Sequence, residues 1–309
     1  MKAKTLQTIF QSKFDLVGII ETKRYLEAAQ SMGKNVLNET YPTMVVLGLS
    51  YPKRMIKHTE THLVPSFYTF GKDYHLVLKA RMESILNELG LDYRLGVDNH
   101  NHDERLAATL AGLGFFGKNQ LIISPMFGSY FFLGLVFINT PLEHEIVLSV
   151  DDDCGSCRKC IDACPTHALS DQGYTMSLCM SHYNQSKRIL TDHEMDANYS
   201  LFGCDICQLV CPKNINIVKI SHPEFELSGK EMVSIVDLFT DSEKTFKAKY
   251  HEMPYLWKGK TVLMRNALLI LKRLHMKQHI ELIETTQEKT TVVWYQDTLN
   301  RVLKALKEE

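Results

Sequence analysis

Eight cysteines constrain this 309-residue chain more than any other feature, because all of them fall between residues 154 and 211. The first run has the spacing Cys-x2-Cys-x2-Cys-x3-Cys-Pro and the last has Cys-x2-Cys-x3-Cys-Pro, with one cysteine between the runs. In chain order they are Cys154, Cys157, Cys160, Cys164, Cys179, Cys204, Cys207 and Cys211. A thiolate is a soft ligand that suits iron, and the first run has a spacing typical of iron–sulfur segments.

Disulfides and structural zinc are the alternatives to iron for such a set. Disulfides require an oxidising compartment, and the dense Cys-x-x-Cys spacing argues against them. Two zinc sites would use the same number of cysteines, but the Cys-Pro endings favour iron–sulfur chemistry. The sequence therefore predicts two [4Fe–4S] clusters bound by the eight thiolates.

Composition indicates an ordinary soluble protein, with 45% hydrophobic and 23% charged residues. The start of the chain does not read as a signal peptide, and no apolar run approaches the ~18–20 residues that a membrane span needs. We therefore expect a cytoplasmic protein of about two or three domains, with no membrane partner. The net charge of -1 means that a nucleic-acid site would have to be a local patch.

The chain before the cysteines alternates between predicted helices and strands, which indicates an α/β or α+β domain at residues 1–148. Helices are expected in residues 1–22 before a strand, then at 25–30, 74–89 and 104–113, and strands at 43–50, 93–97, 121–124 and 130–139. Residues 149–222 read as loops and short helices of a ferredoxin-like domain. Residues 223–309 read as helical, with a HEAT-like hairpin of helices 262–274 and 292–308 that must pack on the rest of the protein. The predicted fold class is α+β.

The segment Gly112–Gly117 matches the letters of the dinucleotide-binding motif GxGxxG. That motif must follow a strand and open a helix, whereas this one follows a predicted helix. We interpret its glycines as a helix C-cap and a tight loop that carries Lys118 and Asn119.

Asp98 ends a short predicted strand and precedes an irregular, polar stretch. A carboxyl group at such a position can donate a proton in a pocket. The alternative is that Asp98 or Asp103 caps the helix that starts at Glu104, and local sequence leaves both interpretations open. His100 and His102 could bind a metal, but we interpret them as surface histidines.

Several cations could form one basic patch: Lys187, Arg188, Lys213, Lys258, Lys260, Arg265, Lys272, Arg273 and Lys277. Such charges are usually a solvated face. The segment Trp257–Asn266 is the best candidate for phosphate contacts.

Segments spread over residues 43–275 together resemble the epoxyqueuosine reductase family. The segments that carry the resemblance are Pro65–His75, Val97–Asp98, Glu104–Arg105, Ala111–Asn119, Pro125–Gly134, both cysteine runs, Gly203–Pro212 and Arg265–Leu268. The resemblance implies a cobalamin- and iron–sulfur-dependent enzyme that reduces epoxyqueuosine in tRNA to queuosine. It also implies a cobalamin-binding domain similar to that of reductive dehalogenases.

The resemblance further implies residue roles. Asp98 matches the family's catalytic acid, which an apolar site near the corrin would keep protonated. The positions expected to contact cobalamin or substrate are Asp98, Lys118, Asn119, Ser124, Gly128, Ser129, Ser181 and Arg188. The first cluster would be held by Cys154, Cys157, Cys160 and Cys211, and the second by Cys164, Cys179, Cys204 and Cys207. No Asp-x-His-x-x-Gly motif is present, so no histidine is expected as the lower ligand of cobalt.

The implied partners are tRNA, recognised at an anticodon loop that contains epoxyqueuosine, and a flavodoxin- or ferredoxin-like electron donor. A monomer is expected. The chain departs from the family at Asp98-Asn99-His100-Asn101, where Asp-Thr-Gly-Pro is usual, and at Phe67, where arginine is common. One alternative is a cobalamin-dependent reductase of another substrate, such as an organohalide. The other is a ferredoxin-type electron carrier, which the large domain before residue 149 disfavours.

Overall fold

The computed structural model describes residues 2–36, 38–51, 54–98, 100–146, 150–287 and 289–308, in two compact units. Unit 1 comprises Met1–Pro52, Tyr74–Arg158 and Val210–His222, and unit 2 comprises Lys53–Asp73, Lys159–Leu209 and Pro223–Glu309. The cysteine segment is therefore shared between the units. The three consecutive domains expected from the sequence divide the chain differently, and their boundaries remain a prediction.

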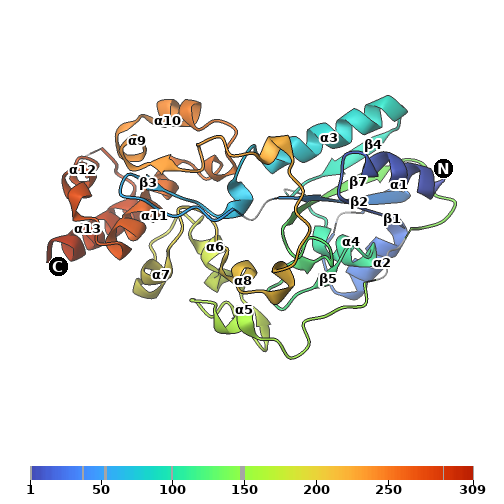
Figure 1. Ribbon diagram of the computed structural model, residues 1–309, viewed down its shortest axis with the longest axis horizontal. Helices are drawn as coiled ribbons and strands as arrows, with labels where there is room; N and C mark the ends of the chain where they lie inside the picture. The colour runs from blue at the N-terminus through green and yellow to red at the C-terminus, as the bar shows by residue number, and fades with distance from the viewer. Residues whose placement is uncertain are drawn as a thin grey trace. The chain divides into compact units, whose positions relative to one another are not determined.

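Unit 1 is built on a four-stranded sheet in the order β1-β2-β7-β4 (Figure 1). The strands are β1 (Leu16–Glu21), β2 (Thr43–Ser50), β4 (Tyr93–Gly96) and β7 (Phe131–Ile138), and each neighbouring pair is antiparallel. Every residue of β2 is buried, as expected for a central strand that is covered on both faces. The strands expected at 43–50, 93–97 and 130–139 are confirmed to within one residue at each end.

The helices of unit 1 cover both faces of this sheet, with α2 and α4 on one face and α3 on the other (Figure 1). These helices are α1 (Ala3–Gln11), α2 (Thr22–Ser31), α3 (Tyr74–Leu89) and α4 (Glu104–Leu110). Unit 1 also contains the short strands β5 (Phe115–Phe116) and β6 (Ile122–Ile123) and the 3-10 turn η3 (Pro212–Asn214). Gly134 of β7 lets α3 approach closely, because a Cβ there would lie 2.3 Å from the Met82 side chain.

The GxGxxG segment behaves as a loop, as predicted. Gly112 has a φ of +72° at the end of α4, and the Leu113 N–H closes the helix on the Ala108 carbonyl at 2.9 Å. The chain then enters the short strand β5 rather than a helix. This excludes the geometry of a dinucleotide-binding motif at Gly112–Gly117.

Unit 2 is mainly helical. Its helices are α5 (Lys159–Asp162), α6 (Met180–Tyr183), α7 (Asp192–Ala197), α8 (Ile206–Leu209), α9 (Ile235–Thr240), α10 (Glu243–Lys249), α11 (Lys260–Arg273), α12 (Ile280–Glu284) and α13 (Val293–Glu308). Its strand pairs are β3 (His62–Leu63) with β10 (Val233–Ser234) and β8 (Leu169–Ser170) with β9 (Gly173–Tyr174). Its 3-10 turns are η1 (Phe67–Thr69), η2 (Met176–Leu178), η4 (Pro223–Phe225), η5 (Pro254–Leu256) and η6 (Lys277–His279).

The C-terminal helical hairpin is confirmed as α11 and α13, and it packs on the remainder of unit 2. Helix α11 contacts α13, α9 and α7, and it is buried at every position from 262 to 271. It is thus a central helix of this unit. Over the described residues, no helix is both long and apolar enough to cross a membrane.

Candidate active site and metal centres

In unit 1, three cysteine thiols lie near one another. Burial raises the pKa of the Cys211 thiol above its ordinary value, and the neighbouring Cys154 and Cys157 thiols add to that rise. None of these cysteines forms a disulfide. They are three of the four ligands expected for the first cluster; the fourth, Cys160, belongs to unit 2, and the full ligand set remains a prediction.

In unit 2, the remaining cysteines lie near one another, and desolvation has a large effect on two of their thiols. Burial raises the pKa of Cys204 to about 12 and that of Cys207 well above its ordinary value. The thiols that affect Cys207 are those of Cys204, Cys179, Cys160 and Cys164. These include all four ligands expected for the second cluster. Among the described residues, no three histidine, cysteine or carboxylate side chains converge as a ligand set for a single metal ion.

Lys118, expected to contact cobalamin, is engaged with the first cysteine loop. Its Nζ donates to the carbonyl oxygens of Gly155 at 2.7 Å and Cys157 at 3.0 Å. Its backbone N–H donates to the Sγ of Cys154 at 3.4 Å. Hydrogen bonds to the sulfurs are one of the protein's means of tuning an iron–sulfur cluster. The geometry therefore gives Lys118 a place beside the first cluster.

The neighbouring Asn119 presents a different feature. Its side chain is buried, and its Oδ1 accepts the N–H of Leu121 at 3.2 Å. Its Nδ2 has no hydrogen-bond partner among the described residues. A buried donor without an acceptor costs about 1–3 kcal/mol, so this amide fits a site that is completed by a polar ligand.

The turn that carries Ser124, Gly128 and Ser129 is held by hydrogen bonds to the side chain of Asn214. Ser124 and Gly128 exchange backbone hydrogen bonds of 2.8 and 2.9 Å. The Asn214 side chain accepts the N–H of Ser129 at 2.8 Å and donates to its Oγ at 2.9 Å. The φ of Gly128 is +56°, and a Cβ there would lie 2.0 Å from Asn214 Oδ1. The sequence did not single out Asn214; its only signal is that it follows the ligand candidate Cys211 by three residues.

Asp98 lies just beyond β4 with a φ of 55°, a left-handed conformation that is uncommon for a residue other than glycine. Its Oδ2 accepts the hydroxyl of Tyr74 at 3.2 Å and lies 3.3 Å from Nε2 of His75. Its N–H donates to Glu104 at 2.9 Å. Asp103, not Asp98, caps α4, because its carboxylate accepts the N–H of Leu106 at 2.9 Å. The capping alternative for Asp98 is therefore wrong.

The protonated Asp98 that the resemblance implies remains a prediction. Its hydrogen bond with His75 lowers the pKa of the carboxyl below the ordinary value, and this outweighs the opposite effect of partial burial. The Tyr74 hydrogen bond acts in the same direction. The Asp98 side chain is 58% exposed. These contacts favour the ionised form of its carboxyl group.

A cavity of about 580 Å³ opens beside Asp98 in unit 1. Its lining is strongly polar and includes Lys34, His102, Glu104 and Arg105. Asp98 itself is among the residues that line this cavity.

His100 and His102 are packed rather than on the surface, contrary to our interpretation. Nε2 of His100 lies 3.0 Å from Glu104 Oε1. The ring of His102 lies 4.7 Å from that of Phe137, and desolvation lowers the pKa of His102.

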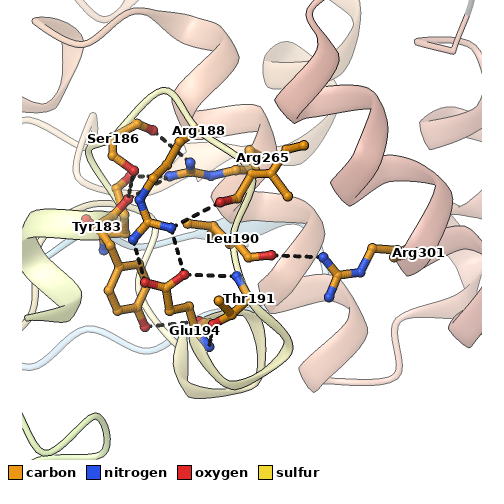
Figure 2. A network of polar contacts seen from close by, with 10 residues as sticks. Tyr183, Ser186, Arg188, Leu190, Thr191, Glu194, Arg265 and Arg301 are labelled. Carbon is orange, nitrogen blue, oxygen red and sulfur yellow. Dashed lines mark hydrogen bonds and ion pairs between the residues drawn. The ribbon is translucent and has the colours of Figure 1, made fainter. Parts of the chain in front are cut away.

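Two of the predicted cofactor contacts, Ser181 and Arg188, belong to unit 2. The Ser181 carbonyl accepts from Gln185 at 2.8 Å. Arg188 forms an ion pair with Glu194 and donates two hydrogen bonds to its carboxylate (Figure 2). The ion pair lowers the pKa of Glu194 to about 2.

The phosphate contacts expected in Trp257–Asn266 are wrong for three residues, because Lys260, Arg265 and Asn266 are buried. Nζ of Lys260 donates to the Asp241 carbonyl, and Arg265 donates to carbonyls within unit 2. The Trp257 ring is exposed, with Nζ of Lys258 3.4 Å from its centroid. This pair remains available at the surface of the segment.

The two sets of thiols define a protein of the double-cluster iron–sulfur class. A family model described as a 4Fe-4S double cluster binding domain matches residues 153–214. This bears out the two [4Fe–4S] clusters expected from the cysteine spacing.

The chain belongs to the epoxyqueuosine reductase family. It is 36% identical to the epoxyqueuosine reductase of Bacillus anthracis over 76% of this chain, and this match spans 64% of the length of that relative. It is 33% identical to that of Lactococcus garvieae over 75% of this chain and 69% of the relative. A crystal structure of epoxyqueuosine reductase with an epoxyqueuosine-modified tRNA-Tyr stem loop superposes with a TM-score of 0.79 and 25% identity, covering 98% of each chain. The mixed helix-and-sheet fold class expected from the sequence is confirmed.

Proposed function

We propose that this protein is an epoxyqueuosine reductase that acts on tRNA. The observation that carries the proposal is the likeness over 98% of both chains to a reductase solved with an epoxyqueuosine-modified stem loop. The Asp98 carboxylate beside a polar cavity of unit 1 supports it. The proposal includes a cytoplasmic monomer that receives electrons from a flavodoxin- or ferredoxin-like donor.

The reaction removes the epoxide oxygen as water and therefore consumes two electrons and two protons. Each [4Fe–4S] cluster passes one electron at a time, so the paired clusters suit a two-electron reduction that draws on a one-electron donor. The thiols of Cys154, Cys157 and Cys211 in unit 1, and those around Cys207 in unit 2, are the proposed attachment points.

Cobalamin is the proposed second cofactor. The Asn119 amide, which is buried and lacks an acceptor among the described residues, fits a bound polar group. The further residues proposed to hold cobalamin are Lys118, Ser124, Gly128, Ser129, Ser181 and Arg188. Since the polar atoms of Lys118 and Ser129 are already engaged, they would position the loops more than contact the cofactor. When bound, cobalamin would supply the two-electron, nucleophilic redox chemistry that the reduction of an epoxide requires.

Asp98 is the proposed proton donor, and His75 is the proposed source of its proton. The ionised Asp98 carboxylate, 3.3 Å from Nε2 of His75, can take a proton from a protonated His75 and pass it to the leaving oxygen. Tyr74 steadies the same carboxylate oxygen through its hydroxyl. These two contacts support a proton relay through His75 and Asp98.

The test is an anaerobic assay of protein reconstituted with iron, sulfide and cobalamin. Substrate is an epoxyqueuosine-containing anticodon stem loop, the reductant is a reduced flavodoxin, and queuosine is detected by mass spectrometry of the digested RNA. Conversion supports the proposal. Absence of conversion, with cobalamin bound and eight irons per chain for two clusters, would overturn it.

Asp98→Asn tests the proton donor. It should lower the rate about 10²- to 10⁴-fold, the usual contribution of general acid–base catalysis, with iron content unchanged. Asp92→Asn is the matched control, because Asp92 is an exposed aspartate of unit 1 that bonds to Asn139 and Tyr41. His75→Gln removes the hydrogen bond that lowers the pKa of Asp98, so the corresponding pKa in the pH–rate profile should move to higher pH. An unchanged profile would argue against the relay.

A further inference from the structure

Arg265 is a fully buried cation in the middle of helix α11, with 0% of its surface exposed. Figure 2 shows its guanidinium directed toward the turn that contains Tyr183 and Ser186. It donates to the carbonyl oxygens of Ser186 at 2.7 Å and of Asn184 at 2.7 Å, and to Asn266 Oδ1 at 3.0 Å.

Within the described parts of the chain, every hydrogen bond of Arg265 goes to a neutral oxygen. The nearby carboxylate of Glu194 is already engaged by two hydrogen bonds from Arg188 (Figure 2). Burial lowers the pKa of Arg265 to about 10, so the side chain is still a cation at neutral pH. The Glu194 carboxylate attracts this charge but does not offset the effect of burial, and a buried charge that is only partly compensated is destabilising. An anion near this side chain would explain why the charge is there.

Arg265 and Asn266 hold the two segments that carry ligand candidates of the second cluster. Asn184 follows Cys179 by five residues and exchanges side-chain hydrogen bonds with the backbone of Gly203, which precedes Cys204. Nδ2 of Asn266 donates to the Asn184 carbonyl at 2.8 Å and to the Leu201 carbonyl at 3.0 Å. One pair of α11 side chains therefore fixes both segments.

The guanidinium of Arg265 and the thiols of Cys179 and Cys204 lie close enough to act electrostatically on one side chain, Tyr183. The hydroxyl of Tyr183 is affected by the charges of Cys204, Cys179 and Arg265. Four thiolates around a [4Fe–4S]²⁺ core carry a net charge of two minus, and reduction adds one more negative charge. A buried cation at this place would favour the more negative, reduced state.

We propose that Arg265 is a positioning residue and the counter-charge of the second cluster, and that it raises the reduction potential of that cluster. The step concerned is the transfer of one electron from the donor to the [4Fe–4S]²⁺ cluster to give [4Fe–4S]⁺, without a bond made or a proton moved. The inference rests on the double-cluster assignment and not on the substrate, so it can fail or hold independently of the tRNA reaction.

The experiment is an EPR-monitored redox titration of reconstituted protein, with iron counted per chain, for wild type, Arg265→Gln and Arg265→Lys. Arg301→Gln is the matched control, because Arg301 belongs to the same network but pairs with the carboxylates of Asp192 and Asp297. In Arg265→Gln, the reduction equilibrium constant of one cluster should fall about tenfold, which is about 59 mV for one electron. The other cluster and the Arg301→Gln protein should titrate as in wild type.

Arg265→Lys keeps the charge but loses the planar fork. The reduction potential of its second cluster should be close to that of wild type. If Arg265→Gln does not retain its iron, Arg265→Lys is the variant that tests the proposal. The proposal is overturned if Arg265→Gln binds both clusters with wild-type potentials, or if Arg265→Lys shows the same fall as a neutral side chain. It is also overturned if every Arg265 variant unfolds by circular dichroism, since Arg265 would then be only a core residue.

Discussion

The two sets of thiols differ in how much water and charge surround them. In unit 1, Lys118 holds the loop of Cys154 and Cys157, and the ion pair of Lys213 with Asp152 has side chains that are 37% and 35% exposed. In unit 2, desolvation strongly raises the pKa of the Cys204 and Cys207 thiols. Charges near the surface are screened, whereas buried charges act at full strength. We therefore expect two clusters of unequal potential and unequal dependence on the fold.

The strongest test of this difference is to remove one predicted cluster ligand from each set of thiols. Cys207→Ser should abolish the reduction of epoxyqueuosine and halve the iron content. It should also lower the melting temperature, because it leaves a buried pocket of unpaired polar groups. Cys154→Ser should also halve the iron content but change the melting temperature less, because the strong desolvation is found at Cys207. Iron analysis and thermal unfolding measure both effects. Equal losses of stability would argue that the two environments are alike.

Gly128→Ala tests how the unit 1 site is anchored. The substitution forces a side chain into a φ of +56° and against Asn214 Oδ1, and it should destabilise the protein by about 1–2 kcal/mol. Gly90→Ala is the matched control, because Gly90 has a φ of +61° but nothing within 4 Å of a Cβ. A chemical unfolding series gives the difference between the two. If both variants lose the same stability, the Asn214 contact contributes nothing.

Glu194→Gln tests the ion pair of unit 2 and should cost about 1 kcal/mol, as for a partly exposed pair. Gln keeps the capping box with Thr191, so the change isolates the charge. The folded-state pKa of Glu194 is lowered from 4.5 to about 2, so its contribution is complete above pH 4.5 and disappears as the pH falls toward 2. The difference in unfolding free energy between variant and wild type should therefore shrink over that range. A difference that is constant with pH would contradict the ionic origin.

Lys118→Met gives the smallest expected effect and sharpens the contrast with Arg265. The backbone hydrogen bond to Cys154 remains, and only a half-exposed charge is lost. The reduction equilibrium constant of the first cluster should fall about threefold or less, against about tenfold for Arg265→Gln, because exposed charges are screened. The same redox titration measures it. A larger fall than in Arg265→Gln would reverse the comparison.

The sequence predicts the elements of this protein well where the local pattern is continuous. The strand Thr43–Ser50 and the helix Tyr74–Leu89 were expected with their observed bounds, since one is an unbroken apolar run and the other has helical spacing that ends at Gly90. The cysteine spacing likewise predicts the double-cluster segment, because ligand spacing is a local property.

The partners of functional side chains are set by contacts that no local pattern records. Tyr74 and His75 meet Asp98 only because α3 returns along the sheet beside β4. Arg265 reads as part of a solvated basic face, yet it is buried. The available signal was the apolar character of α11 around its whole circumference, since a helix of that kind is buried on every side and so are its polar residues.

Helix α11 also bears on when the second cluster can be assembled during synthesis of the chain. The ligand candidates Cys179 and Cys204 are translated more than 50 residues before Arg265 and Asn266, the side chains that hold their segments in place. A nascent chain therefore carries all eight cysteines before the side chains that hold the segments of Cys179 and Cys204 have been synthesised. Completion of the second cluster should therefore follow the synthesis of residues 260–273.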